Sequence, residues 1–500
     1  MKHWLSRIVC TNNRSKVNLF SGLSYQFISV CMGLVLPHLF IVNLGSESNG
    51  LISSIGQIYV CLGLLEAGVS TTTIQALYKP VANNDHTSIN AILAATHKYY
   101  RKAGLWYAIG IVVLTIVYPR FVDSALPDTT IRRVIALQGM GAVVSFLFQS
   151  KYTLLLRAEG KNYIQTLLSL LLLIVRNAGK IIAIQLGYDI VTVQAIHFVT
   201  IIIEAFVILF YIKHHYPWLT VKGKPDFDSI SQKGSVFVQY VAWTVFNHTD
   251  ILVLTIITRN LALVSVYSVY SLVFDAAQNI MNEIRSAFQY KIGYKAQQGS
   301  VQLDEYFSKY NPIVISLTFI VFSAVYLITK PFIILYTQGI TDINYLVGGV
   351  AELFFTLKVL YGLRALNKQV IDANGHFKQT RRIPIIEAIS NIGVSILLVF
   401  YFGLCGVLIG TVCSLLIGFA LYVHYIMNNV APKAMKAQLG LIMISFPIVL
   451  ATIFLENYMH YMPTSWWQFV VFSLIVAVSS AVSYALVYLF FYRIQHRYGR

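Results

Sequence analysis

The chain has 500 residues, of which 57% are hydrophobic and only 11% are charged, and its formal net charge is +17. A soluble protein of this size needs a far more polar surface, so the composition excludes a soluble globular protein. Lys and Arg gather near the ends of apolar stretches, which argues against nucleic acid as the reason for the basic excess.

The sequence predicts an all-α polytopic membrane protein with about fourteen transmembrane helices, because uncharged apolar windows of about 18 residues recur along the chain. The alternating pattern of an outer-membrane barrel is absent from the sequence. The predicted spans are 19–42, 50–78, 101–120, 133–156, 163–186, 190–213, 234–258, 261–284, 311–330, 345–368, 383–402, 404–427, 440–460 and 467–492.

The distribution of basic residues predicts the orientation. Starting inside, the segments that would be cytoplasmic carry most of the Lys and Arg, among them Arg364 and Lys368 at the end of the tenth span. The outside segments carry only Arg120, Arg132, Arg133, Arg259 and Lys330. We therefore expect a multi-pass protein of the plasma or inner membrane with both termini in the cytoplasm.

The inside segment 85–100 has apolar residues at helical spacing, including Ile89, Ile92 and Leu93. This pattern predicts an amphipathic helix that lies along the membrane surface before the third span.

Short sequences recur at a fixed distance. Ala158-Glu159-Gly160 parallels Ala373-Asn374-Gly375, and Leu186-Gly187 parallels Phe402-Gly403, at a shift of about 215 residues. The shift predicts two six-helix lobes in parallel duplication plus two C-terminal helices. The expected parts are 1–216 with spans 1–6, 217–432 with spans 7–12, and 433–500 with spans 13–14.

The twelfth span carries small residues four apart, namely Gly406, Gly410, Ser414 and Gly418. Such a strip predicts close approach of a neighbouring helix.

Arg176 and Lys180 are the candidate centre of the protein. They share one face of the fifth span, and Arg176 lies about 20 Å from its start at Tyr163, past the middle of a hydrocarbon layer. In one interpretation both face a water-filled cavity and hold an anionic head group. In the other, Lys180 reaches the interface and Arg176 pairs with an acid such as Glu204.

Acids within the spans complete the set of substrate-binding candidates. These are Glu66 in the second span, Glu204 in the sixth and Asp275 in the eighth, where Gln278, Asn279 and Asn282 extend a polar stripe. The alternative for each acid is a hydrogen bond between helices, which is the favoured interpretation for Glu387.

One or more acids could bind a coupling ion, H⁺ or Na⁺. A sodium site needs several oxygens, and Asp250, Asn391 and Thr411 on the seventh, eleventh and twelfth spans could supply them.

The sequence contains no motif of a catalytic or nucleotide-binding site, and its cysteines form no CxxC pair. We therefore expect no catalytic residues, no bound metal centre, no cofactor and no enzyme activity.

The sequence predicts two six-span lobes with two extra spans, and it has Gly50-Leu51-Ile52-Ser53 at the second span and Tyr267-Ser268-Val269-Tyr270 at the eighth. In these features the chain resembles the polysaccharide-export flippases. These belong to the multidrug/oligosaccharidyl-lipid/polysaccharide flippase (MOP) superfamily. The resemblance implies a V-shaped pair of lobes around a cationic cavity. It also implies alternating access and export of a lipid-linked oligosaccharide, a polyprenyl-diphosphate sugar unit, to the outer leaflet. Expected partners are membrane lipids, a polysaccharide polymerase and the glycosyltransferases of the same pathway.

Other functions stay open. A multidrug extruder of the same superfamily would favour acids and aromatic residues in the cavity and usually lacks spans 13–14. A membrane polysaccharide polymerase or ligase would need a larger outer loop than 119–132 or 330–345. A major facilitator would carry a GxxxDR-like motif after its second span, where this chain reads KPVANNDHT.

Overall fold

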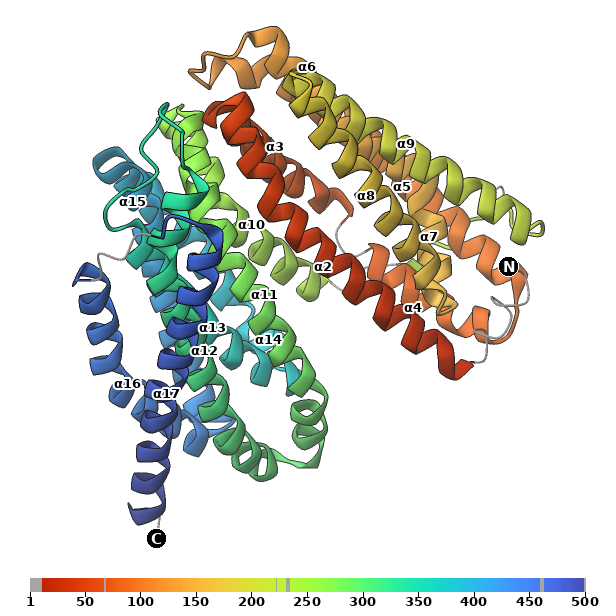
Figure 1. Ribbon diagram of the computed structural model, residues 1–500. Coiled ribbons are helices and arrows are strands. Elements are labelled where there is room, and N and C mark those ends of the chain that lie inside the picture. Colours follow the sequence, from red (N-terminus) through yellow and green to blue (C-terminus); the bar gives the residue numbers. More distant parts are fainter. Residues whose placement is uncertain (1–10, 67–68, 222, 231–233, 459–462, 499–500) are drawn as a thin grey trace. The chain divides into compact units, whose positions relative to one another are not determined.

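The computed structural model describes residues 11–66, 69–221, 223–230, 234–458 and 463–498, and their regular secondary structure is helical throughout. The chain divides into two compact units (Figure 1). The first comprises Met1–Thr244 and Arg259–Leu261, and the second comprises Val245–Thr258 and Ala262–Arg500.

The helices of the first unit follow one another through short turns. They are α2 (Thr11–Leu44), α3 (Ser46–Leu62), η1 (Gly63–Glu66), α4 (Val69–Ala82), α5 (His86–Val117), η2 (Tyr118–Arg120), α6 (Asp128–Val144), η3 (Ser145–Gln149), α7 (Ser150–Ala158), α8 (Asn162–Gln185), α9 (Ile190–His215) and η4 (Asp228–Ile230). Helix α10 (Gly234–Thr258) runs on into the second unit.

The second unit continues with longer helices. They are α11 (Leu261–Gln298), α12 (Ser300–Tyr336), α13 (Val350–Ala373), α14 (Phe377–Thr380), α15 (Arg382–Asn429), α16 (Pro432–Tyr458) and α17 (Trp466–Tyr498).

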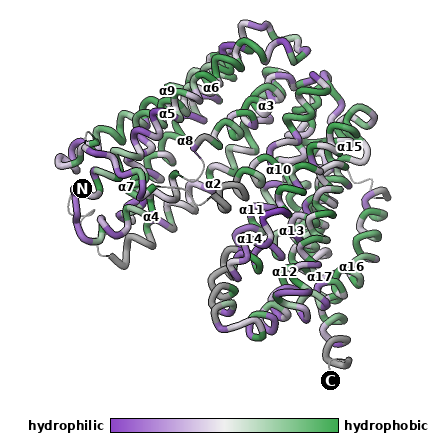
Figure 2. Tube along the Cα trace, turned by 180° about the vertical axis from the view of Figure 1, so that it is seen from behind, coloured by the Kyte–Doolittle hydropathy of each residue, from purple (hydrophilic) through white to green (hydrophobic). Residues whose placement is uncertain are grey.

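The all-α membrane prediction is confirmed. Ten helices of the described chain are long and apolar enough to cross a membrane, and apolar residues follow most of each helix in Figure 2. Large apolar side chains remain exposed on them, for example Leu474, Ile475 and Val478 on α17. Lipid accommodates such a surface, because hydrocarbon solvates apolar side chains and leaves the helical backbone to satisfy itself.

Three predicted spans differ in detail from the observed helices. The second span is not one helix, because η1 interrupts it between α3 and α4. The predicted spans 11 and 12 form α15, whose two halves are separated at Gly403 by a left-handed turn with φ 53°.

The surface helix predicted for 85–100 is wrong. Helix α5 runs without a break from His86 to Val117, and Ile92 and Leu93 on it are buried in the core of the first unit. Asp85 caps the helix by accepting hydrogen bonds from the amides of Thr87 and Ser88, each 3.1 Å long. The Ser88 hydroxyl, which also donates to Asp85, is the main reason why the pKa of this carboxyl lies below its ordinary value.

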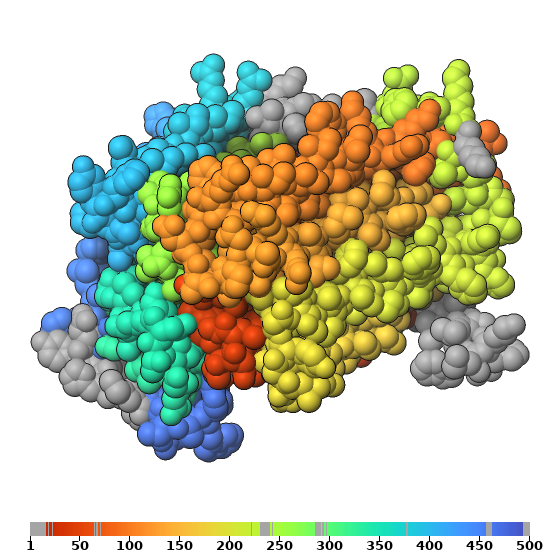
Figure 3. Space-filling model, turned by 90° about the horizontal axis from the view of Figure 1, so that it is seen from above, coloured from red at the N-terminus to blue at the C-terminus, as the bar shows by residue number. Residues whose placement is uncertain are grey.

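Each unit packs around a small number of central helices. In the first unit α6 contacts α5 and α9, and α8 contacts α2 and α9. Figure 3 shows the orange and yellow segments of this unit packed side by side. In the second unit α12 contacts α13, α16 and α17, so the C-terminal pair is attached mainly through α12.

The backbone repeats its unusual conformations. Gly160 and Gly375 have φ of 70° and 69°, and each follows a helix end at which the next amide bonds back to the carbonyl five residues earlier. Gly187 and Gly403 form a second pair, and the shift of about 215 residues also joins Gly45 with Arg259 and Asn84 with Gly299. All eight positions have positive φ. An internal duplication would produce such a recurrence, and the duplication itself remains a prediction.

The small-residue strip packs as predicted. A Cβ atom on Gly406 would overlap the carbonyl of Leu398, and one on Gly410 would overlap the Ser395 hydroxyl. The two halves of α15 therefore approach each other along this strip at backbone distance.

Candidate functional site

Arg176 and Lys180 lie on α8, the helix that contacts both α2 and α9. Lys180 is 8% exposed, and Arg176 is half-buried. Among the ion pairs of the described residues, none includes either cation. Two basic groups therefore remain in the α2–α8–α9 seam without a described carboxylate in direct contact.

Glu204 on α9 is close to this pair but does not bind it. Its charge acts on Arg176, as does the hydroxyl of Tyr25 on α2. Its carboxylate accepts a hydrogen bond of 2.6 Å from Ser169 on α8 instead. The Arg176–Glu204 ion pair that the sequence leaves open is not formed.

Helices α8 and α9 also carry two buried amides and a histidine. Asn177 on α8 and Gln194 on α9 are 3% and 2% exposed. His197 lies within the influence of both charges, and its buried Nδ1 atom has no hydrogen-bond partner among the described residues. The seam is therefore polar, with more hydrogen-bonding capacity than its own described residues satisfy.

Glu66 belongs to a different cluster. It ends η1, where the second span is interrupted, and accepts 2.7 Å hydrogen bonds from Ser70 on α4 and Tyr100 on α5. No contact of the described residues joins it to Arg176. The hydrogen bonds from these two hydroxyls explain why a carboxylate is tolerated at this position.

Asp275 is placed differently from the other acids. It is exposed on α11, and its carboxylate forms an ion pair with Lys358 on α13 at 2.5 Å. Asn279 and Asn282 of the predicted polar stripe are also exposed, whereas Gln278 is buried. The polar stripe therefore follows the boundary between the buried and the exposed face of α11.

The three predicted ion ligands come together in the second unit. Asp250 on α10 accepts hydrogen bonds from Thr411 at 2.8 Å and Tyr267 at 3.1 Å, and Asn391 donates to Thr411 at 2.8 Å. Asp250, Asn391 and Thr411 are at most 5% exposed. The Asn391 Oδ1 atom has no hydrogen-bond partner in the described part of the chain. Two carboxylate oxygens, a hydroxyl and an unused amide oxygen form a donor set suited to a hard cation.

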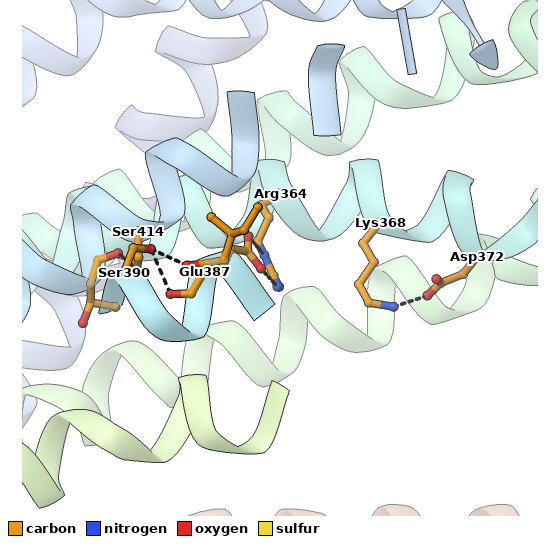
Figure 4. A network of polar contacts seen from close by, with 8 residues as sticks. Arg364, Lys368, Asp372, Glu387, Ser390 and Ser414 are labelled. Atoms are coloured by element: carbon orange, nitrogen blue, oxygen red, sulfur yellow. Dashed lines mark hydrogen bonds and ion pairs between the residues drawn. The ribbon is translucent and has the colours of Figure 1, made fainter. Parts of the chain in front are cut away.

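The sequence interpretation missed one buried ion pair. Arg364 was assigned to an inside segment, but α13 continues to Ala373 and leaves Arg364 2% exposed. Its Nε atom donates to Glu387 Oε1 at 2.6 Å, and its Nη2 atom donates to the other carboxylate oxygen (Figure 4). The guanidinium also lies over the rings of Phe246 and Tyr422, 5.5 and 5.8 Å from their centroids.

The strip of small residues in the predicted twelfth span was a sequence signal for this pair. Gly418 faces Glu387 so closely that a Cβ atom there would overlap the carboxylate. The glycine strip thus leaves room for a buried acid, and such an acid needs a cation on a neighbouring helix.

Comparison with known proteins identifies the fold. No protein-family model matches the chain, and no curated protein matches it in sequence. Among solved structures it is similar to the lipid II flippase MurJ in an inward closed conformation, with a TM-score of 0.62 and 15% identity, over 96% of this chain and 99% of that chain. The chain shares the fold of this flippase.

Other transporters with this fold match over less of the chain. An inward-facing multidrug resistance MATE transporter gives a TM-score of 0.61 with 14% identity, over 81% of this chain and 95% of that one. The MATE multidrug transporter DinF-BH gives 0.51 with 13% identity, over 86% and 97%. The chain therefore shares an all-α, multi-pass fold with these proteins.

Proposed function

We propose that this protein is a flippase that moves a lipid-linked oligosaccharide from the inner to the outer leaflet by alternating access, for cell-surface polysaccharide biosynthesis. The observation that carries the proposal is the extent of the match to the lipid II flippase, which leaves 4% of this chain outside it and so includes most of α16 and α17.

The chemistry of the first unit supports a polyprenyl-diphosphate substrate. A diphosphate needs cations while its charge crosses the apolar layer, and a guanidinium matches phosphate oxygens in pairs. Arg176 and Lys180 offer charges that no described acid neutralises by direct contact. Glu204 lies close enough to orient Arg176, while Glu66 and Asp275 remain candidates for contacts to the saccharide.

The second unit contains the binding site for the coupling ion. Asp250, Asn391 and Thr411 bind Na⁺, or Asp250 binds H⁺, and binding of the ion biases the transporter toward one of its two conformations. The unused Asn391 oxygen favours the sodium form of this proposal.

A multidrug extruder is the second candidate. It is favoured by the inward-facing MATE transporter, whose TM-score of 0.61 is close to that of the flippase. The unneutralised Arg176 and Lys180 would repel a positively charged drug.

Cellular context follows from the first proposal. Both termini lie in the cytoplasm of the plasma or inner membrane, where glycosyltransferases assemble the substrate. A polysaccharide polymerase receives it on the outer side.

Complementation tests the proposal. A strain that lacks its polysaccharide flippase is transformed with the wild-type gene, with Arg176→Ala, or with Arg133→Ala as an exposed arginine of the same unit. We expect surface polysaccharide from the wild type and Arg133→Ala, and loss of it with Arg176→Ala at equal membrane abundance. Drug resistance without polysaccharide would favour the extruder.

A further inference from the structure

Arg285 on α11 is a buried cation without an acid among the described residues. It is 7% exposed, its Nη2 atom donates to the side-chain oxygen of Asn282, and its buried Nη1 atom has no described partner. No ion pair of the described residues includes it. A guanidinium cannot lose its proton in a protein, so burial leaves a charge that needs a counter-ion.

The groups around Arg285 are polar and only partly satisfied. Gln369 on α13 donates to the Arg285 carbonyl at 2.9 Å, and Gln278, about two turns earlier on α11, donates to Asn282 at 3.1 Å. The Oε1 atom of each glutamine is buried without a hydrogen-bond partner among the described residues. One donor of Arg285 and one acceptor on each of two glutamines linked to it by hydrogen bonds are therefore unsatisfied within the described chain.

Helix α12 also contributes to this region. The hydroxyls of Tyr310 on α12 and Tyr361 on α13 interact electrostatically with Arg285. Asn279, Asn282 and Glu283 on the adjoining edge of α11 are exposed, so Arg285 lies directly behind a polar surface. Because Asn282, which accepts a hydrogen bond from Arg285, is itself exposed, the guanidinium lies close to the surface of the unit.

We propose that Arg285, Gln278 and Gln369 form a binding site for hydrogen phosphate or a phosphomonoester within the second unit. The phosphate oxygens accept from the guanidinium fork, which suits their geometry. The P–OH group donates to a glutamine oxygen, which neither chloride nor a phosphodiester can do. This site is independent of Arg176, which belongs to the first unit.

The test measures unfolding of the full-length protein in detergent. The unfolding temperature is followed by intrinsic fluorescence while inorganic phosphate is added to a chloride-free gluconate buffer. The variants are Arg285→Lys, which keeps the charge but loses the fork, Gln369→Leu, and Arg381→Lys as an exposed arginine of the same unit.

We expect a saturable rise in the unfolding temperature of the wild type and of Arg381→Lys. The phosphate concentration at half-saturation should increase about tenfold in Arg285→Lys, because one charge-assisted hydrogen bond is lost. Gln369→Leu should weaken binding in the same direction.

A second arm separates the two sources of the group. The protein is placed in phosphatidylcholine nanodiscs with or without phosphatidic acid, whose head group is a phosphomonoester. A rise that depends on Arg285 and needs phosphatidic acid identifies a lipid ligand, whereas a rise with inorganic phosphate alone identifies a soluble one. If neither probe gives an Arg285-dependent rise, or if chloride gives the same rise, the proposal is wrong.

Discussion

Buried charged side chains in the described part of the chain differ in whether an ion pair neutralises them. Arg364 and Glu387 form a bidentate pair at 2% and 0% side-chain exposure. Arg176, Lys180 and Arg285 are without an acid in direct contact among the described residues. Paired charges stabilise one arrangement, whereas open cations are available to ligands.

Arg364→Met should lower the free energy of unfolding by about 3–5 kcal/mol, because it leaves the Glu387 carboxylate buried without a partner. The matched control is Lys368→Met, which breaks a partly exposed pair with Asp372 one turn along α13 and should cost less than about 1 kcal/mol. Denaturant unfolding in detergent measures both. An equal decrease in the free energy of unfolding of the two variants would show that the buried Arg364 pair stabilises the protein no more than the partly exposed one.

Asp250→Asn should abolish stabilisation by the coupling ion. At about ten times its Kd, Na⁺ should stabilise the wild type by about 1.4 kcal/mol. The unfolding temperature is compared in NaCl and KCl, with Asp275→Asn as an exposed acid of the same unit. A sodium effect that survives in Asp250→Asn would assign the ion to another place.

The chemistry of the side chains allowed part of the residue-level arrangement to be predicted. Asp250, Asn391 and Thr411 are grouped because their oxygens could together hold a sodium ion, and their hydrogen bonds join them. Arg364 was missed because a charge near a span end is the usual mark of a loop. Only its partner on α15 shows that the helix continues past it.

The contact between the two halves of α15 depends on glycines. The halves of α15 approach each other at Gly406, Gly410 and Gly418, where any Cβ atom would overlap the facing half. This explains why the strip could be predicted from the sequence, since only small residues permit such an approach.

Gly410→Val should separate the halves of α15 and lower stability by about 1–3 kcal/mol, because an overpacked contact forces backbone shifts. Gly393→Ala on the same helix is the control, since nothing in the described chain lies within 4 Å of its added Cβ atom. Thermal unfolding and membrane abundance measure the effect. If the two variants are equally stable, the close packing has no energetic role.

Interruptions within helices were harder to predict than their packing. An apolar window averages over the residues of η1, so the break between α3 and α4 is invisible in hydropathy. The error at α5 has the opposite origin. Its first turns are amphipathic because they pack on the first unit's core, and amphipathicity alone does not tell a core from a membrane surface.

At the scale of the molecule, the fold was predictable because lipid imposes few solutions. Backbone groups in hydrocarbon must bond within their own helix, so apolar length and turn positions suffice to place the helices. The turns are also built in few ways, because residues with positive φ recur at corresponding positions about 215 residues apart. Substrate identity is different, since it depends on side chains that no length or period specifies.

The orientation is testable with single cysteines in a cysteine-free background. Thr129→Cys and Asn83→Cys both lie at exposed positions of the first unit. A membrane-impermeant maleimide should label Thr129→Cys in intact cells and Asn83→Cys only after lysis, because the basic segments remain inside. The reverse pattern would invert the proposed direction of transport.

We propose above that Arg176 and Lys180 carry a diphosphate-linked saccharide across the membrane. Reconstitution into liposomes with a fluorescent polyprenyl-diphosphate oligosaccharide tests it most directly, by the fraction of substrate that an impermeant quencher reaches over time. Wild type and Arg133→Ala should expose the inner pool at the same rate, while Arg176→Ala should leave it protected as in protein-free liposomes. Equal rates for wild type and Arg176→Ala, or no transfer by the wild type, would contradict the account.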